Sequence, residues 1–294
     1  MPSQGSNGKE TKSSLSEQFA KDGYVYLRQA IPVNDDCLKD WSQLFTELWS
    51  VLFQRLFERG HISSPTDSYL DNGTEKRIYT LGLGIKHGFR QVVMRSPGRY
   101  ELSLLNHPEW FFDEKNGKDL LEKLKVQLGP IVLPILDKDS WDDVNITNLS
   151  FVVSTPGAPS QGWHADGGHV ALDVHKPCHC LNVFVPLQDM PSAEWGPTEI
   201  RPESHYYTRN LAPMLLAAKA RKQLRPTVAP LLQLGDVLAF DYRVLHRGLA
   251  NTTQDGLRAI LVLTVSEVWF QDRLNFPKRS MYDDPANIIL SKDS

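Results

Sequence analysis

The sequence predicts one domain in which N-terminal helices support a mainly β core, built as an antiparallel sandwich or barrel. Two patterns favour this fold class. Amphipathic helical periodicity dominates residues 15–130, whereas residues 144–270 consist of short apolar or alternating runs bounded by turn residues. Short strands at such spacing are typical of sandwiches and barrels. The composition, 41% apolar and 23% charged over 294 residues, is that of an ordinary globular protein.

The chain begins with a polar stretch that has no apolar core segment. We expect residues 1–14 to form a disordered tail, because such a stretch resembles neither a signal peptide nor a membrane anchor. The domain is then expected to span residues 15–294, with a helical layer over about 15–130 and the β core over about 144–270. Within this layer a short helix leads to Gly23, and Tyr24 to Leu27 favour a strand.

The strongest helical pattern begins after a capping Asn34 or Asp35 and ends at Gly60. Such apolar stripes usually face a core, so we expect this helix to pack across the back of a sheet, with a ligand groove or subunit contact as the alternative. A second amphipathic helix is predicted to end at the pair Gly129-Pro130. The stripe of the first helix consists of Leu38, Trp41, Leu44, Phe45, Leu48, Trp49, Leu52, Phe53 and Leu56.

The β region contains six candidate strands. A helical insert at about residues 212–224 interrupts them without the features of a separate domain. The runs are ITNLSFVVS, HVALDV, CLNVFVPL, PTEIRP, GDVLAFD and LRAILVLTVSEVWF.

Three residues of this region have the character of a metal site. His164 and Asp166 stand one residue apart in an extended stretch, so their side chains project to the same face. His246 follows a buried strand and precedes a turn. Two histidines and one carboxylate on a β scaffold match the facial arrangement that holds non-haem Fe(II) and leaves positions open for a chelating cosubstrate and O2. A structural zinc site would instead be closed by a fourth ligand.

Arg258 begins an otherwise apolar strand. A guanidinium group that enters a β core needs an anion as its partner. A guanidinium group fits a carboxylate through two parallel hydrogen bonds. The far carboxylate of 2-oxoglutarate would be such a partner. The alternative is a structural ion pair with Asp241 or Asp255.

Four segments in this order resemble the phytanoyl-CoA dioxygenase-like branch of the Fe(II)/2-oxoglutarate-dependent oxygenases. They are QGWHAD, EWGPTEIRPESH, GDVLAFDYRVLHRG and LRAILVLT, within a match from about Asn148 to Phe270, with weaker similarity through MRSPGRYEL. The resemblance implies a double-stranded β-helix core of the jelly-roll or cupin-like kind. It also implies Fe(II), 2-oxoglutarate and O2 as the reacting partners, with 2-oxoglutarate decarboxylated to succinate.

Carried over residue by residue, the resemblance makes His164, Asp166 and His246 the iron ligands and Arg258 the anchor of 2-oxoglutarate. Gln161 and Thr198 are implied to hydrogen-bond the same cosubstrate. The chain departs from the family pattern at two positions. Glu203 stands where the family usually has Gly, and Trp195 stands where it often has Asn.

An acidic substrate would need a cation beside the iron. The segment GFRQVVMRSPGRYEL provides Arg90, Arg95 and Arg99, with Tyr79 and Tyr100 nearby in the sequence. We expect Arg95, Arg99 and Tyr79 to contact substrate if this segment folds over the mouth of the barrel. The alternative is a basic edge exposed to solvent, because Lys and Arg are mostly exposed.

A second group of possible metal ligands lies in GGHVALDVHKPCHC. It lacks the paired spacings of zinc fingers and ribbons, so a loop that enters a strand, with its thiols buried as small apolar groups, is the favoured interpretation over a zinc site. The group consists of His169, His175, Cys178, His179 and Cys180.

Net charge, apolar runs and cysteine content limit the kinds of binding partner and the cellular compartment. A net charge of −3 argues against a nucleic-acid surface, and the sequence contains no apolar run long enough to cross a membrane. The three cysteines fit a reducing, cytoplasmic setting. We therefore expect an oxygenase, monomeric or homodimeric, that oxidises a C–H bond of a small organic molecule in a biosynthetic pathway, by hydroxylation, desaturation or cyclisation. A catalytically silent β-barrel that binds a ligand, and a peptide or protein hydroxylase, are the alternatives.

Overall fold

The computed structural model describes residues 7–65, 80–105, 114–210, 225–272, 275 and 277–283. None of the described helices is long and apolar enough to span a membrane. In chain order the helices and strands are α1 (Asn7–Asp22), β1 (Tyr24–Leu27), α2 (Asp36–Glu58), β2 (Val92–Ser96), β3 (Arg99–Ser103), α3 (Glu114–Ile135), β4 (Val144–Ser154), β5 (Cys180–Pro186), β6 (Thr198–Ile200), β7 (Val237–Asp241), β8 (His246–Gly248) and β9 (Arg258–Glu267).

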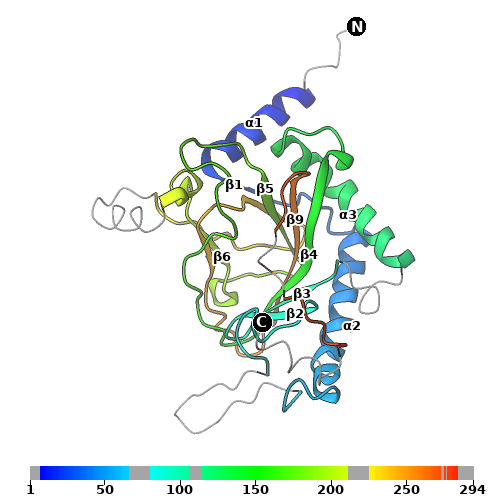
Figure 1. Ribbon diagram of the computed structural model, residues 1–294. Coiled ribbons are helices and arrows are strands. Elements are labelled where there is room, and N and C mark those ends of the chain that lie inside the picture. Colours follow the sequence, from blue (N-terminus) through cyan, green and yellow to red (C-terminus); the bar gives the residue numbers. More distant parts are fainter. Residues whose placement is uncertain are drawn as a thin grey trace.

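Two antiparallel sheets form the core. The large sheet has seven strands in the order β1-β7-β5-β9-β4-β3-β2, and the small sheet pairs β6 with β8. Isolated bridges extend the small sheet on both sides, from His164 to His246 and from Ile200 to Val228. Figure 1 shows α2 and α3 on one side of the large sheet and β6 on the other. The predicted β core with flanking helices is therefore confirmed.

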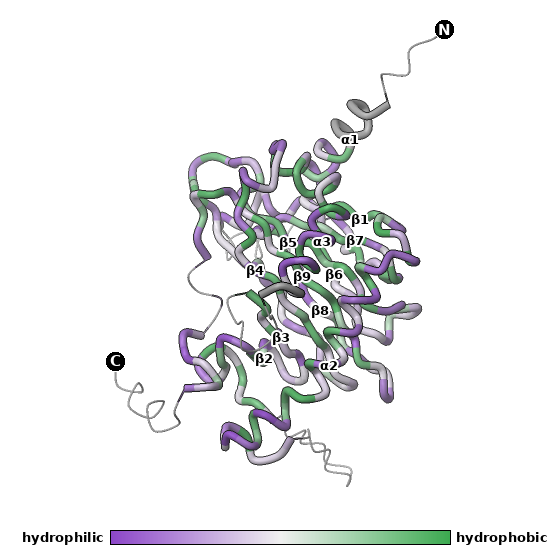
Figure 2. The backbone as a smooth tube through the Cα atoms, turned by 90° about the vertical axis from the view of Figure 1, so that its right-hand side faces the viewer, coloured by the Kyte–Doolittle hydropathy of each residue, from purple (hydrophilic) through white to green (hydrophobic). Residues whose placement is uncertain are grey.

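The two faces of the large sheet carry different side chains. On β9, Leu261 and Leu263 belong to the core shared with the helices, whereas Ile260 and Val262 belong to the apolar cluster between the sheets. Because side chains alternate along a strand, Arg258 and Thr264 lie on this second face. The central strands are accordingly the most hydrophobic part of the tube in Figure 2, and many outer loops are hydrophilic.

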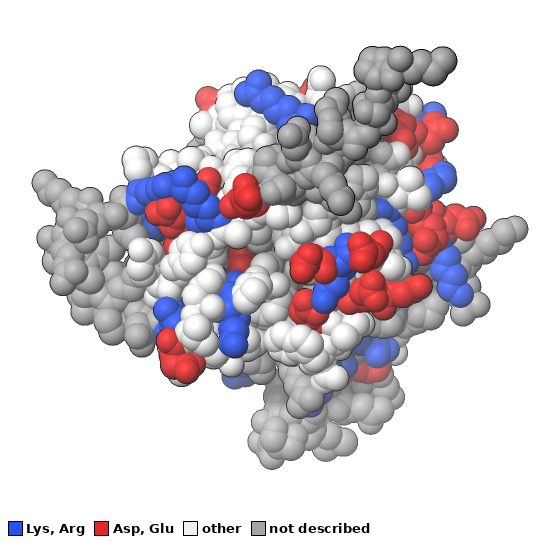
Figure 3. Space-filling view, turned by 90° about the horizontal axis from the view of Figure 1, so that it is seen from above, with Lys and Arg blue, Asp and Glu red and all other residues white. Residues whose placement is uncertain are grey.

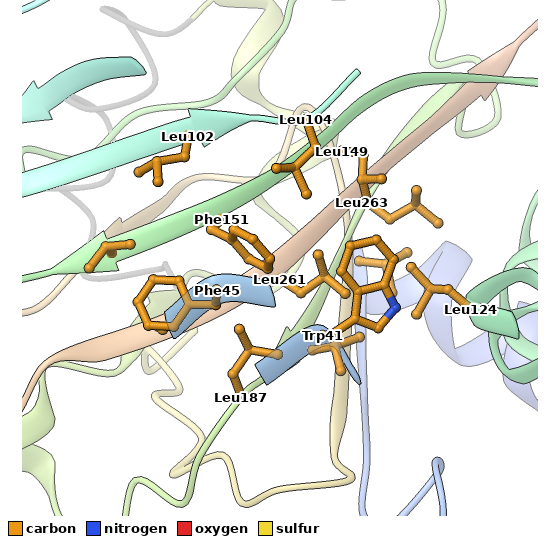
Figure 4. Close-up of a cluster of buried hydrophobic side chains, with 14 of the residues drawn as sticks. Trp41, Phe45, Leu102, Leu104, Leu124, Leu149, Phe151, Leu187, Leu261 and Leu263 are labelled. Carbon is orange, nitrogen blue, oxygen red and sulfur yellow. The ribbon is translucent and has the colours of Figure 1, made fainter. Parts of the chain in front are cut away.

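The helical layer packs by its predicted stripe. Asp35 caps α2 by accepting a hydrogen bond from the backbone nitrogen of Cys37 at 2.7 Å. Trp41 and Phe45 then point from α2 to Phe151 of β4, with ring centroids 6.1 and 5.4 Å apart in edge-on geometry (Figure 4). Burying aromatic rings of this size contributes much of the stability of such a layer.

Several boundaries differ from the sequence prediction. α1 begins at Asn7, before the domain start expected at residue 15. α3 does not end at Gly129-Pro130 but continues to Ile135. Buried Leu128 and Val132 flank the proline on the core side, and their packing outweighs the hydrogen bond that the proline ring removes.

Two further segments were assigned wrongly. The run HVALDV forms no strand, because Val170, Leu172 and Val174 point to solvent instead of pairing with a sheet. The region expected to be a helical layer also contains β2 and β3, which lie at one edge of the large sheet, whereas the strand expected at Tyr24 to Leu27 is confirmed as β1 at the other edge. The helical insert expected at residues 212–224 lies outside the described residues.

Candidate metal centre

The polypeptide brings three predicted ligands together at the edge of the small sheet. The backbones of His164 and His246 exchange two hydrogen bonds, of 3.1 and 2.9 Å, so their imidazoles project side by side with ring centroids 4.4 Å apart. The backbone nitrogen of Asp166 donates to the carbonyl of Tyr242, which places the carboxylate next to both rings. All three ligand atoms lie within 4.8 Å of one another.

The imidazole tautomers suit metal binding. Nδ1 of His164 lies 2.9 Å from the carbonyl of Gly162, and Nδ1 of His246 lies 3.1 Å from that of Val244. A ring whose Nδ1–H donates to a carbonyl leaves Nε2 as the lone-pair donor. These Nε2 atoms face Asp166 at 3.7 and 3.5 Å. Burial lowers the pKa of His246, which favours the neutral, ligating form.

The cluster opens into a cavity of about 550 Å³ between the two sheets. Arg99 and Arg258 lie in this cavity, on β3 and β9, both paired to Ser154 of the intervening strand β4. Their side chains therefore share a face and a level of the sheet. Each side chain is about 2% exposed or less.

These two arginines are short of partners. Arg99 donates to the carbonyl of Leu249 at 2.6 Å and Arg258 donates to that of Gly196. The other nitrogens of Arg99, Nε and Nη1, and Nε of Arg258 are buried without an acceptor. Burial lowers the pKa of Arg99 to about 10 and, together with the charge of Arg99, that of Arg258 to about 9. Two adjacent buried cations are costly unless an anion binds between them.

Gln161 and Thr198 also line the cavity, and both lie next to Gly248, with which Thr198 pairs in the small sheet. Oε1 of Gln161 accepts a hydrogen bond from the backbone nitrogen of Gly248 at 3.0 Å. A Cβ atom on Gly248 would lie 2.7 Å from Nη1 of Arg99 and 2.9 Å from Gln161 Oε1. The glycine therefore makes room for these side chains to converge, two residues after the candidate ligand His246.

The residues expected to contact substrate do not gather at one place in the structure. Arg95 lines the cavity but forms an ion pair with Glu101 at 2.6 Å. Arg99 is buried beside the residues expected to hold cosubstrate and is not at the mouth of the barrel. Tyr100 faces the helices and contacts Trp49 and Phe53. Arg90 is exposed, and Tyr79 lies outside the described residues.

The contacts of the described residues bear on two alternatives, a structural ion pair of Arg258 and a zinc site in residues 169–180. Asp241 pairs with Arg243 at 2.6 Å, and no carboxylate of the described residues pairs with Arg258. Among the described residues, the possible zinc ligands of residues 169–180 do not come together as a group of three. Glu203, which replaces the usual Gly, adopts φ of +64°. This left-handed conformation explains the preference of the family for Gly at that position.

Sequence reasoning missed several residues that line the cavity. Asn182 is one of them, and its signal was a polar residue within the apolar run CLNVFVPL. Tyr242, Asp272 and Asn275 are others, and they hydrogen-bond one another at 2.5 to 2.6 Å. Their positions in a loop and near the end of the chain provided no periodic pattern.

Comparison with known proteins extends these observations. The sequence matches the family described as phytanoyl-CoA dioxygenase over residues 19–260. No curated protein matches it. Many solved structures share the fold, and three of them, all at low identity, illustrate the likeness.

AviO1 from Streptomyces viridochromogenes Tue57 is 18% identical, with a TM-score of 0.55, over 89% of this chain and 97% of that chain. The non-heme alpha ketoglutarate dependent carbocyclase SnoK from nogalamycin biosynthesis is 16% identical, with a TM-score of 0.54, over 90% and 87%. EctD from S. alaskensis with bound Fe is 16% identical, with a TM-score of 0.51, over 92% and 79%.

Fold, candidate site and family match together define a double-stranded β-helix enzyme of the Fe(II)/2-oxoglutarate-dependent oxygenase class. The chain belongs to the phytanoyl-CoA dioxygenase family. The predictions of family, fold class and cofactor type are thereby confirmed.

Proposed function

We propose that this protein oxidises a C–H bond of a small organic molecule, with Fe(II) held by His164, Asp166 and His246. One observation carries the proposal: the three-residue cluster opens into the same cavity as Arg99 and Arg258, each of which has at least one buried nitrogen without an acceptor. A neutral imidazole pair and one carboxylate suit Fe(II), and two guanidinium groups suit an anion such as 2-oxoglutarate.

The roles of the residues follow from their positions. Arg258, whose Nε is buried without an acceptor, would bind the far carboxylate of 2-oxoglutarate, and Thr198 and Gln161 would hydrogen-bond the cosubstrate. Arg99 adds a second positive charge at this end, a role that replaces the substrate contact expected from the sequence. When bound, Fe(II) and 2-oxoglutarate supply the oxidation of C–H by O2, and 2-oxoglutarate is converted to succinate and CO2.

The cavity walls favour an uncharged, hydrogen-bonding substrate over an acid. An acid would need a spare cation, but the charge of Arg95 is balanced by Glu101, which also accepts from Asn148 at 2.9 Å. On another wall, Tyr242 and Asp272 present a hydroxyl and a carboxylate that already hydrogen-bond each other. SnoK, named as a carbocyclase of nogalamycin biosynthesis, supports a biosynthetic role for this fold.

The test is consumption of 2-oxoglutarate by the purified protein. Anaerobic addition of Fe(II) and 2-oxoglutarate should produce the visible charge-transfer band of a chelated iron complex, and admission of air should release succinate. Asp166→Ala should lose both signals. A silent ligand-binding barrel would bind 2-oxoglutarate without releasing succinate, and a peptide hydroxylase would release succinate faster with peptides than with small molecules.

The cellular setting is also part of the proposal. Cys37, Cys178 and Cys180 are free thiols, and burial raises the pKa of each. Free buried thiols and a ferrous cofactor are both maintained most readily in a reducing compartment. We therefore place the enzyme in the cytoplasm, acting on a small molecule as a monomer or homodimer.

A further inference from the structure

The ligand Asp166 is held by a chain of two buried polar residues from the centre of the large sheet. Asn182 of β5 stands directly opposite Thr264 of β9, and both are 3% exposed. Oγ1 of Thr264 donates to Oδ1 of Asn182 at 2.7 Å. Nδ2 of Asn182 then donates to Oδ2 of Asp166 at 2.6 Å.

The series of hydrogen bonds from Thr264 through Asn182 to Asp166 has a defined direction. Ionised Asp166 is an acceptor only, so the amide must turn its nitrogen to the carboxylate and its oxygen to the Thr264 hydroxyl. Reversing the amide would place two oxygens in contact and leave a buried donor unpaired, which costs about 1–3 kcal/mol. Asp166 therefore determines which end of Asn182 faces it, and the Thr264 hydroxyl holds this orientation by donating to the amide oxygen at the other end.

Asn182 and Thr264 lie where burying a polar side chain costs free energy of folding unless its hydrogen bonds are made. The neighbours Leu181 and Val183 on β5 face the helix side, and Phe184 on the same face as Asn182 is packed in the apolar cluster between the sheets. An apolar residue would be the simplest filling for position 182, because a buried amide must find partners for both ends. Both partners are present, and one of them is the carboxylate of the metal cluster.

We propose that Asn182 is a positioning residue that holds Asp166 in a one-oxygen mode of metal ligation, with Thr264 orienting the amide. This inference rests on the proposed iron site. Asp166 follows the isolated bridge at His164 and lies in no strand, and its side chain is 28% exposed, so the backbone alone leaves the carboxylate free to rotate. The hydrogen bond engages Oδ2 and would leave Oδ1, which lies 3.7 Å from Nε2 of His164, for the metal, so that positions would stay open for cosubstrate.

The test measures metal binding directly. Apo protein is titrated anaerobically with Fe(II), alone and with 2-oxoglutarate, and the dissociation constant and charge-transfer band are recorded. Asn182→Leu should weaken Fe(II) binding about 10- to 100-fold and shift the band, as expected for loss of an outer partner of a ligand. Thr264→Val should act in the same direction, and Thr264→Ser, which keeps the hydroxyl, should restore binding to near the wild-type value.

Ser266→Ala is the matched control. Ser266 lies on the same face of β9, is fully buried, and donates to the carbonyl of Glu267 instead of to Asn182. Its variant should bind Fe(II) like the wild type. If Asn182→Leu does not fold, the comparison of Thr264→Val with Thr264→Ser and Ser266→Ala decides the question.

The outcomes separate two failures. A wild-type protein that binds neither Fe(II) nor 2-oxoglutarate overturns the proposed function and this inference with it. A wild type that binds both, with Asn182→Leu and Thr264→Val within twofold of its affinity and with an unchanged band, overturns the positioning role alone. Equal weakening by Ser266→Ala would show a general effect of the sheet and would also overturn it.

Discussion

Arg99 and Arg258 bury their guanidinium groups at one end of the cavity, and no carboxylate of the described residues pairs with either. We predict that Arg258→Met raises the dissociation constant of 2-oxoglutarate about 30- to 150-fold, because a hydrogen-bonded charge pair contributes about 2–3 kcal/mol. Arg99→Met should have a smaller effect in the same direction. Calorimetric titration with 2-oxoglutarate in the presence of Fe(II) measures both.

The control for this prediction is Arg225→Met. Arg225 is partly exposed and pairs with Asp22 and Glu203, away from the cavity residues. Its variant should bind 2-oxoglutarate as the wild type does. Unchanged affinity in Arg258→Met would remove the arginine from the cosubstrate site.

Gly248 allows a second prediction about one residue. A Cβ atom there would displace the Arg99 guanidinium and the Gln161 amide, which are flexible side-chain ends, so folding should change little. We predict that Gly248→Ala raises the dissociation constant of 2-oxoglutarate about tenfold while Fe(II) binding stays within about threefold, a difference of about 1.4 kcal/mol on the cosubstrate. Gly168→Ala, where a Cβ would meet nothing within 4 Å, is the control.

At the scale of elements, the packing of α2 on β4 supports the sheet that carries the site. Trp41 is fully buried against Phe151, whereas Phe57 on the same helix is 42% exposed. We predict that Trp41→Ala lowers the free energy of unfolding by about 3–5 kcal/mol and Phe57→Ala by less than about 1 kcal/mol. Urea denaturation followed by circular dichroism gives both values. Similar losses in the two variants would contradict the assigned orientation of α2.

Elements were predicted from sequence where one local signal dominated. The aromatic stripe and the Asp35 cap defined α2, and the apolar runs defined β4, β5, β7 and β9. α3 and the run HVALDV were mispredicted because burial decided against local preference: Pro130 is carried within a packed helix, while Val170 and its neighbours have no sheet to join.

At the scale of the whole molecule, charge is distributed in small clusters. On the face seen in Figure 3, basic and acidic side chains of the described residues are interspersed. The unusual electrostatic feature is a pair of partly buried histidines. His169 and His175 lie next to each other, with ring centroids 6.3 Å apart, in the loop after the candidate ligands His164 and Asp166, near the ion pair of Arg243 and Asp241.

The histidines predict how stability depends on pH. Burial, with a further contribution from Arg243, lowers the pKa of His169 and of His175 to about 4, from 6.5. The unfolded chain therefore binds more protons between pH 6.5 and 4, so stability is complete above about pH 6.5 and falls as the pH drops towards 4. Asp241 opposes this shift by raising both pKa values, whereas Arg209 adds to it by lowering them.

Thermal unfolding of the apo protein at pH 7.5, 6 and 5 measures this effect. The melting temperature should fall with each step, and the double variant His169→Gln/His175→Gln should reduce the slope. Equal slopes for the variant and the wild type would assign the acid sensitivity to other groups. Chelator-treated protein avoids a contribution from metal loss at His164 and His246.

By itself, the sequence determined the class of fold, the family and the identities of the candidate ligands, because periodicity, caps, the His164-x-Asp166 pair and the residues around His246 are each readable in a short stretch of the chain. Only the tertiary structure decided that Arg99 lies beside Gly248 and that Asn182 meets Asp166. These contacts join residues 149 and 16 positions apart, and strand register rather than sequence spacing sets the distances between them.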